Sequence, residues 1–314
     1  MNGEQPNGST PQLPTLPLSE QTFLEQHGIP PVLFAYISLV VVFILYQFIG
    51  GLIAALFIIG DGVGGRNVGG LRIATVAAQI IFVFGPTLVL ARMADLKPQA
   101  FLRVGRPKVS TILLPFFAVF SLQQMFQVYM TLQEKVPLPQ AIESKMESLK
   151  RMIEETYKMM VGSSTIPELL AVVVVVAVVP AIAEEFFFRG LVQRSLERGL
   201  GALRGIVIAA VIFGLYHLNP FSLIPLIGLG LYFGFLVYRS NNIWVSVAAH
   251  FYNNLLACIA VYLQLDENFL VTGDPGTLSP VDLAATFAAF SLVFVISTYY
   301  FIIVTKPIIP TLHS

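Results

Sequence analysis

The sequence has 314 residues, of which 56% are apolar and 11% charged, and its formal net charge is zero. A soluble domain carries roughly a quarter charged residues, so this composition indicates an integral membrane protein and gives no electrostatic reason to expect a nucleic-acid partner. The single cysteine, Cys258, excludes an intrachain disulfide and a cysteine-rich metal site.

The first 29 residues contain no lysine or arginine and carry four prolines among serine, glutamine and asparagine. A secretory signal peptide needs a basic start and an apolar centre, which this stretch lacks. We therefore predict a disordered polar tail at residues 1–29, followed by a membrane domain at residues 30–314.

Eight apolar segments are long enough to cross a membrane, which takes roughly 20 mainly apolar residues. Only helices and closed barrels span lipid, and these segments do not alternate as barrel strands do. The prediction is an all-α, polytopic membrane protein with about eight transmembrane helices. The expected spans are 32–59, 72–93, 110–132, 166–190, 203–219, 221–239, 243–264 and 281–304.

Basic residues predict the orientation of these spans, because lysine and arginine accumulate on the cytoplasmic side. The connection from Arg92 to Lys108 holds five basic residues and one acid, and further basic residues follow the fourth, sixth and eighth spans. These groups share one side if both termini are cytoplasmic, although Arg66 and Arg72 fall on the other side. The expected location is the cytoplasmic membrane of a prokaryote.

One connection is itself predicted to be helical. Apolar side chains recur at helical spacing within residues 139–160, with glutamate and lysine between them. They are Ile142, Met146, Leu149, Ile153 and Tyr157. This pattern predicts an amphipathic helix that lies on the membrane or over the bundle.

The fourth span contains the sequence VVVVVAVVPAIAEEFFFRG at residues 172–190. Glu185 and Arg189 are four residues apart and can pair on one helix face. Glu184 points about 100° away, and we expect it to have no local partner. Both glutamates could be packing groups or could lie at the water interface, but ionisable groups within a span are usually functional. We interpret Glu185 as structural and Glu184 as the working acid.

Two later segments contribute candidate polar groups. In FGLYHLNP, residues 213–220, Phe213 can pack on the His217 ring one turn later. Alone, His217 would more often be a hydrogen-bonded core histidine. In HFYNN, residues 250–254, His250 and Asn254 share one face, whereas Asn253 is expected to face another way.

The predicted depths of these residues agree. At 1.5 Å of rise per residue, three helices bring Glu184, His217, His250 and Asn254 near one level in the inner half of the membrane. A carboxylate and a histidine can activate water, and a second histidine with an amide can hold the oxyanion that forms on a carbonyl. This combination predicts an amide hydrolase without a covalent intermediate.

The motifs EEFFFR, FGLYH and HFYNN resemble, in order and type, the EExxxR, FxxxH and HxxxN patterns of the CAAX prenyl protease and bacteriocin-processing family, also called the Abi family. The resemblance covers about residues 166–264. It implies eight helices, an internal cavity holding the active site, and an endopeptidase that acts on a membrane-associated peptide or protein substrate.

The resemblance also implies a role for each motif residue. Glu184 with His217 would activate the water, His250 with Asn254 would form the oxyanion hole, and Glu185 with Arg189 would order the site. No cofactor is expected. If zinc is present instead, Glu184, His217 and His250 are its expected ligands, although the sequence has no HExxH motif.

Other protein classes fit less well. A serine protease would need a GxSxG-type motif within a span, and the sequence has none there. Cys258 is about 12 Å along the helix from His250, too far for proton transfer, and is expected in the core. A proton-coupled transporter would usually show repeats, which are absent from this sequence. A non-catalytic scaffold or bacteriocin-immunity-type protein of the same fold stays open, as do the oligomeric state and the need for prenylation.

Overall fold

The structure is a computed structural model that describes residues 17, 20–59, 67–137, 139–265 and 279–305. The described residues form helices and contain no strand, which confirms the all-α prediction. Labels beginning with η denote π-helical segments. In chain order the helices are α1 (Phe23–Gln26), α2 (Pro31–Phe43), η2 (Ile44–Gly50), α3 (Gly51–Ile59), α4 (Val68–Ala78), η4 (Gln79–Phe84), α5 (Gly85–Ala94), α6 (Pro98–Phe101), α7 (Val109–Glu134), α8 (Gln140–Val161), α9 (Ile166–Val172), η5 (Val173–Val178), α10 (Val179–Glu185), η6 (Phe186–Gln193), α11 (Arg194–Leu200), α12 (Ala202–Tyr216), α13 (Leu223–Ser240), α14 (Ile243–Tyr262) and α15 (Pro280–Val304).

Seven continuous helices in the described part are long and apolar enough to cross a membrane, so the chain is a multi-pass membrane protein. They are Pro31–Phe57, Val68–Ala94, Val109–Glu134, Ile166–Leu200, Leu223–Ser240, Ile243–Tyr262 and Pro280–Val304. The expected span at 203–219 is instead the shorter helix α12, which ends at Tyr216 just before Asn219 and Pro220. Its 15 residues reach about 22 Å, less than the roughly 30 Å hydrocarbon core.

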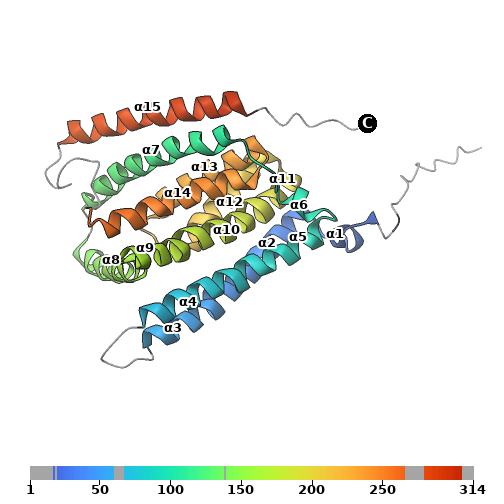
Figure 1. The fold of residues 1–314 in the computed structure, drawn as a ribbon, viewed down its shortest axis with the longest axis horizontal. Coiled ribbons are helices and arrows are strands. Elements are labelled where there is room, and N and C mark those ends of the chain that lie inside the picture. The colour runs from blue at the N-terminus through green and yellow to red at the C-terminus, as the bar shows by residue number, and fades with distance from the viewer. Residues whose placement is uncertain (1–16, 18–19, 60–66, 138, 266–278, 306–314) are drawn as a thin grey trace, which may run out of the picture.

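The long helix Ile166–Leu200 lies near the middle of the bundle (Figure 1). Its α10 part packs against η4 on one side and against α14 on the other. Helix α14 also packs on α7, and α7 runs along α15, which lies at one edge of the bundle in Figure 1. Helices α12 and α13 pack on each other beside this row. The fourth span therefore brings its polar residues into contact with both halves of the chain.

The π-helical segments lie within three of the spans. A π turn has one extra residue per turn and often marks a functional position or a site of local strain. The segment η5 ends just before Pro180, which has no N–H for the carbonyl of Val176 four residues earlier. The segments η2 and η4 lie in the first two spans and contribute side chains to the site described below.

Helix α8 confirms the prediction of a helix at residues 139–160. It runs across the direction of the spans in Figure 1 and packs against α4 and α14. Ile142 and Tyr157 stay 50% and 44% exposed. The Arg72 guanidinium donates hydrogen bonds to the carbonyls of Met159, Met160 and Gly162 at the end of this helix. Thus α8 is attached to the bundle while part of its apolar face remains uncovered.

Most of the predicted tail lies outside the described residues. Within the described part, Thr22 caps the short helix α1 and the side chain of Leu24 is buried. This small portion of residues 1–29 is therefore helical. The structure does not test whether both termini are cytoplasmic, so that orientation stays a prediction.

Candidate active site

Glu185 lies in a buried ion pair. Its Oε1 is 2.9 Å from Nη1 of Arg189, and both side chains are almost fully inaccessible. The pairing expected from their i, i+4 spacing is therefore confirmed. The Arg189 guanidinium also lies over the Phe213 ring, 4.2 Å from its centroid. Breaking a buried pair leaves an uncompensated charge in an apolar interior, so these two residues fix each other and the helix that carries them.

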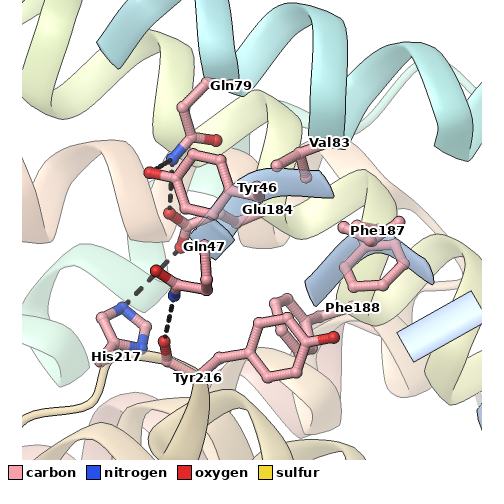
Figure 2. Close-up of a pocket in the computed structure, with 10 residues that line it drawn as sticks. Tyr46, Gln47, Gln79, Val83, Glu184, Phe187, Phe188, Tyr216 and His217 are labelled. Carbon is pink, nitrogen blue, oxygen red and sulfur yellow. Dashed lines mark hydrogen bonds and ion pairs between the residues drawn. The ribbon is translucent and has the colours of Figure 1, made fainter. Parts of the chain in front are cut away.

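Glu184 points into a cavity of about 250 Å³ that also contains His217 (Figure 2). Its partners come from other spans. Gln79 Nε2 donates to Glu184 Oε1 over 3.1 Å, and His217 Nε2 lies 3.9 Å from Glu184 Oε2. The adjacent glutamates therefore face different neighbours, as their 100° separation predicts. The expectation that Glu184 has no local partner holds only for its own helix.

The Phe213 backbone determines which nitrogen of His217 faces Glu184. His217 Nδ1 lies 2.8 Å from the Phe213 carbonyl oxygen, and the two rings are in edge contact at 4.7 Å, which confirms the expected packing. A carbonyl oxygen only accepts hydrogen bonds, so Nδ1 carries the hydrogen. In the neutral ring Nε2 then has a free lone pair, and it is Nε2 that lies near Glu184.

His250 lies in the buried cluster of Glu185 and not among the residues that line the cavity. Its Nδ1 is 2.9 Å from Glu185 Oε1, and its ring stacks on Phe233 with 5.3 Å between centroids. The carboxylate accepts, so Nδ1 carries the hydrogen here as well. Phe213 is in ring contact with both histidines, at 4.7 Å for His217 and 6.1 Å for His250. The two histidines are thus close, but they contact different glutamates.

Asn254 takes part in a chain of side-chain amides. Its Nδ2 donates to the Val176 carbonyl over 2.9 Å, and its Oδ1 accepts from Asn253 Nδ2 over 3.0 Å. Gln123 Nε2 in turn donates to Asn253 Oδ1 over 3.0 Å. Asn253 thus faces α7 while Asn254 faces the fourth span, as expected from their spacing, although the two adjacent amides also bond directly. These contacts fix the orientation of the Asn254 amide.

Comparison with known proteins supports the sequence motifs. Residues 166–256 match the family model described as type II CAAX prenyl endopeptidase Rce1-like. The motif-bearing segment is therefore similar to this family. The chain is also 31% identical over 98 residues to the Bacillus subtilis (strain 168) protein named "Putative membrane peptidase YdiL", a match that covers 31% of this chain and 40% of that relative. No solved structure matches the chain significantly.

The Rce1-like segment does not contain every residue of the cavity. It begins at residue 166, whereas Tyr46, Gln47 and Gln79 line the same cavity from the first two spans. Gln79 is 3% exposed and joins two partners, since its Nε2 also donates to the Tyr46 hydroxyl over 3.0 Å. The sequence interpretation missed these residues. The available signal was an amide placed in an otherwise apolar run, AAQIIFVF.

The three expected zinc ligands do not converge in this arrangement. Among the described residues there is no group of three or more histidine, cysteine, aspartate or glutamate side chains placed to hold a metal ion. Glu184 and His217 approach each other, but His250 Nδ1 is directed at Glu185. A three-ligand zinc site therefore does not fit the geometry of the described residues.

Proposed function

We propose that this protein is an intramembrane endopeptidase that hydrolyses a peptide bond of a membrane-associated or lipidated substrate, using water activated by Glu184 and His217. The observation that carries the proposal is the approach of these two residues within one cavity, with the Nε2 lone pair of His217 beside the carboxylate. Both are hydrogen-bond acceptors. A single water can donate one hydrogen to each of them, because 3.9 Å is a suitable separation for two acceptors of the same molecule.

The reaction then follows from this arrangement. The water oxygen attacks the carbonyl carbon of the substrate while Glu184 takes a water proton, and the carbonyl oxygen becomes an oxyanion. The amide nitrogen next receives the proton from Glu184, the carbon–nitrogen bond breaks, and the carboxylate is regenerated. The products are a free carboxyl group and a free amine. His217 orients the water through Nε2, and its own orientation is fixed by the Phe213 carbonyl.

The buried ion pair of Glu185 and Arg189 restricts the backbone at the neighbouring Glu184. Glu185 is held by Arg189 and His250 together, so the residue before it in the helix has little freedom to move. We therefore assign Glu185 and Arg189 to ordering the site. The family resemblance implies His250 and Asn254 as oxyanion donors, but neither residue lines this cavity. The match to an Rce1-like segment and to a relative named as a membrane peptidase supports the reaction class.

The test compares wild type, Glu184→Gln and Glu147→Gln, expressed at equal levels in native membranes, by mass spectrometry of new peptide termini. Glutamine keeps the size and polarity of Glu184 but cannot accept the water's proton. Glu147 is a matched control, since its side chain is 62% exposed on α8. We expect specific termini that vanish only in Glu184→Gln. Identical maps for all three proteins would favour a non-catalytic scaffold of the same fold.

Metal use is measured on the same proteins. Purified wild type is assayed for bound zinc and for cleavage after chelation. Activity without stoichiometric metal supports the protein-only reaction. Loss of activity on chelation, restored by zinc, would instead require a rearranged site in which His250 turns from Glu185 toward the cavity.

A further inference from the structure

The tyrosine at position 46 has a hydroxyl group that is placed for hydrogen-bond donation. It accepts a hydrogen bond from Gln79 Nε2 over 3.0 Å, and its side chain lines the cavity with Glu184 and His217. Among the described residues, the Tyr46 hydroxyl has no acceptor for its own hydrogen. That hydrogen is therefore available to a group that enters the cavity.

A second tyrosine in the same cavity shows the contrast. The Tyr216 hydroxyl donates to the Leu39 carbonyl, so its hydrogen is already committed to the protein. Figure 2 shows Tyr46, Gln79 and Glu184 gathered at one end of the cavity, with the rings of Phe187 and Phe188 at the other. The cavity thus has a polar end that carries the Tyr46 hydroxyl and an apolar end lined by phenylalanine rings.

Gln79 connects that donor to the acid. Its one amide nitrogen bonds both Glu184 Oε1, over 3.1 Å, and the Tyr46 hydroxyl, over 3.0 Å. This leaves Glu184 Oε2 as the oxygen nearer to His217. Gln79 begins the π-helical segment η4 and Tyr46 lies within η2, so both side chains come from places where the helix departs from its regular path.

His250 and Asn254, the motif residues expected to hold the oxyanion, are less well placed than Tyr46 to donate a hydrogen bond into the cavity. Neither His250 nor Asn254 lines the cavity. His250 uses its Nδ1 hydrogen on Glu185, so in the neutral ring its Nε2 accepts and does not donate. Asn254 uses one amide hydrogen on the Val176 carbonyl. An oxyanion formed beside Glu184 and His217 needs a donor that faces the cavity.

We propose that Tyr46 is a further catalytic residue of this endopeptidase, donating a hydrogen bond from its hydroxyl to the carbonyl oxygen under attack, and that Gln79 is the positioning residue that holds Tyr46 and Glu184 together. The inference rests on the proposed function. The hydroxyl keeps its proton throughout, so no bond to it forms or breaks. Its hydrogen bond strengthens as the carbonyl oxygen becomes an oxyanion, and this selectively stabilises the transition state.

The test uses a synthetic peptide that spans a Glu184-dependent terminus found in the membrane experiment. Steady-state kinetics on this peptide are measured for wild type, Tyr46→Phe, Gln79→Met and the control Tyr36→Phe. Tyr36 is a matched control because it is also a tyrosine of the first span, Pro31–Phe57, but is 44% exposed. Loss of one oxyanion donor typically lowers kcat roughly 100-fold or more. We expect that loss for Tyr46→Phe with KM changed less than about threefold, and a smaller loss for Gln79→Met.

The outcomes separate this inference from the proposed function. If wild type yields no Glu184-dependent terminus, the endopeptidase proposal fails and this inference fails with it. If wild type cleaves the peptide and Tyr46→Phe has the same kcat as Tyr36→Phe, only the role of Tyr46 is overturned. Thermal unfolding in detergent checks that each variant is folded. Should Tyr46→Phe not fold, Gln79→Met decides, and an unchanged kcat in that variant overturns the proposal.

Discussion

The side-chain amide of Asn254 donates a hydrogen bond to the Val176 carbonyl over 2.9 Å. Val176 lies four residues before Pro180, and in a regular helix its carbonyl would accept from the N–H that proline lacks. A helix that crosses lipid has no water with which to satisfy such a group, so a neighbouring side chain is a suitable partner. Asn254 therefore joins α14 to the fourth span at the point where that span is irregular.

A double-mutant cycle tests this relationship. We expect Asn254→Leu to lower the free energy of unfolding by roughly 1 kcal/mol, because the carbonyl loses a donor. Pro180→Ala restores an N–H at position 180. In the Pro180→Ala background, Asn254→Leu should lower the free energy of unfolding by a measurably smaller amount. Thermal and denaturant unfolding in detergent give the four stabilities, and strictly additive effects would show that the Asn254 bond does not depend on the proline.

The adjacent glutamates should differ strongly in their effect on stability. Glu185→Gln removes a charge that Arg189 and His250 both contact, and breaking a buried ion pair typically costs about 3–5 kcal/mol. Glu184→Gln keeps an oxygen for Gln79 and faces a cavity, so its effect should stay below about 1 kcal/mol. The yield of folded protein and its unfolding temperature are compared directly. Equal effects would mean that Glu185 is no more structural than Glu184.

Local spacing predicted the contacts that a single helix determines. The i, i+4 rule gave the pair of Glu185 and Arg189 and the packing of Phe213 on His217, and both are present. Both depend only on the helical repeat, which is set by the backbone. The same rule could not show that His250 contacts Glu185, since that depends on how α14 packs on the fourth span.

The contacts between spans far apart in the sequence could not be predicted. Gln79 and Glu184 are 105 residues apart, and nothing in either segment specifies the other. The π-helical segments add a second difficulty, because a hydrophobic pattern read at 3.6 residues per turn assigns the wrong face beyond each extra residue. Tyr46 and Gln79 lie in such segments. The sequence therefore indicated the reaction class but not the full set of cavity residues.

Asp95, in the connection between the second and third spans, forms an ion pair with Arg198 of the fourth span. Arg198 Nη2 lies 2.6 Å from Asp95 Oδ2, and the Lys97 N–H donates to Asp95 Oδ1 over 2.9 Å. Partial burial opposes ionisation of Asp95, but these hydrogen bonds outweigh it and hold the pKa of the carboxyl below its ordinary value. A lowered pKa means that the stabilisation is present above the unfolded-state value, about 3.9, and is lost as the pH falls through the folded-state value.

Asp95→Asn tests this pH dependence. At pH 6 wild type should have the higher unfolding temperature, by a few degrees at most, because partly exposed ion pairs contribute up to about 1 kcal/mol. The difference should shrink as the pH is lowered through 4 and should vanish once Asp95 is protonated. Unfolding temperatures of both proteins are measured across this range. A difference that stayed constant with pH would assign the effect to the shape of the connection and not to its charge.

Arg72 should control the mobility of helix α8. Its guanidinium donates to the carbonyls of Met159, Met160 and Gly162, which lie at the negative end of the helix dipole, and it also pairs with Glu168 over 3.3 Å. Arg72→Met keeps a long apolar side chain but removes all of these bonds. We expect faster amide hydrogen exchange near the end of α8, by at least about tenfold where about 1.4 kcal/mol of local stability is lost.

The matched control is Arg151→Met on α8 itself. The Arg151 side chain is 66% exposed, and among the described residues it pairs only with Glu147 one turn away, an interaction that adds a few tenths of a kcal/mol. Its removal should leave exchange in the last turn of α8 nearly unchanged. If Arg72→Met also left exchange unchanged, the buried side chain of Val161 would be sufficient to hold the helix end. If instead exchange increased along all of α8, the Arg72 contacts would anchor the whole helix. Without them α8 would be free to move away from the bundle.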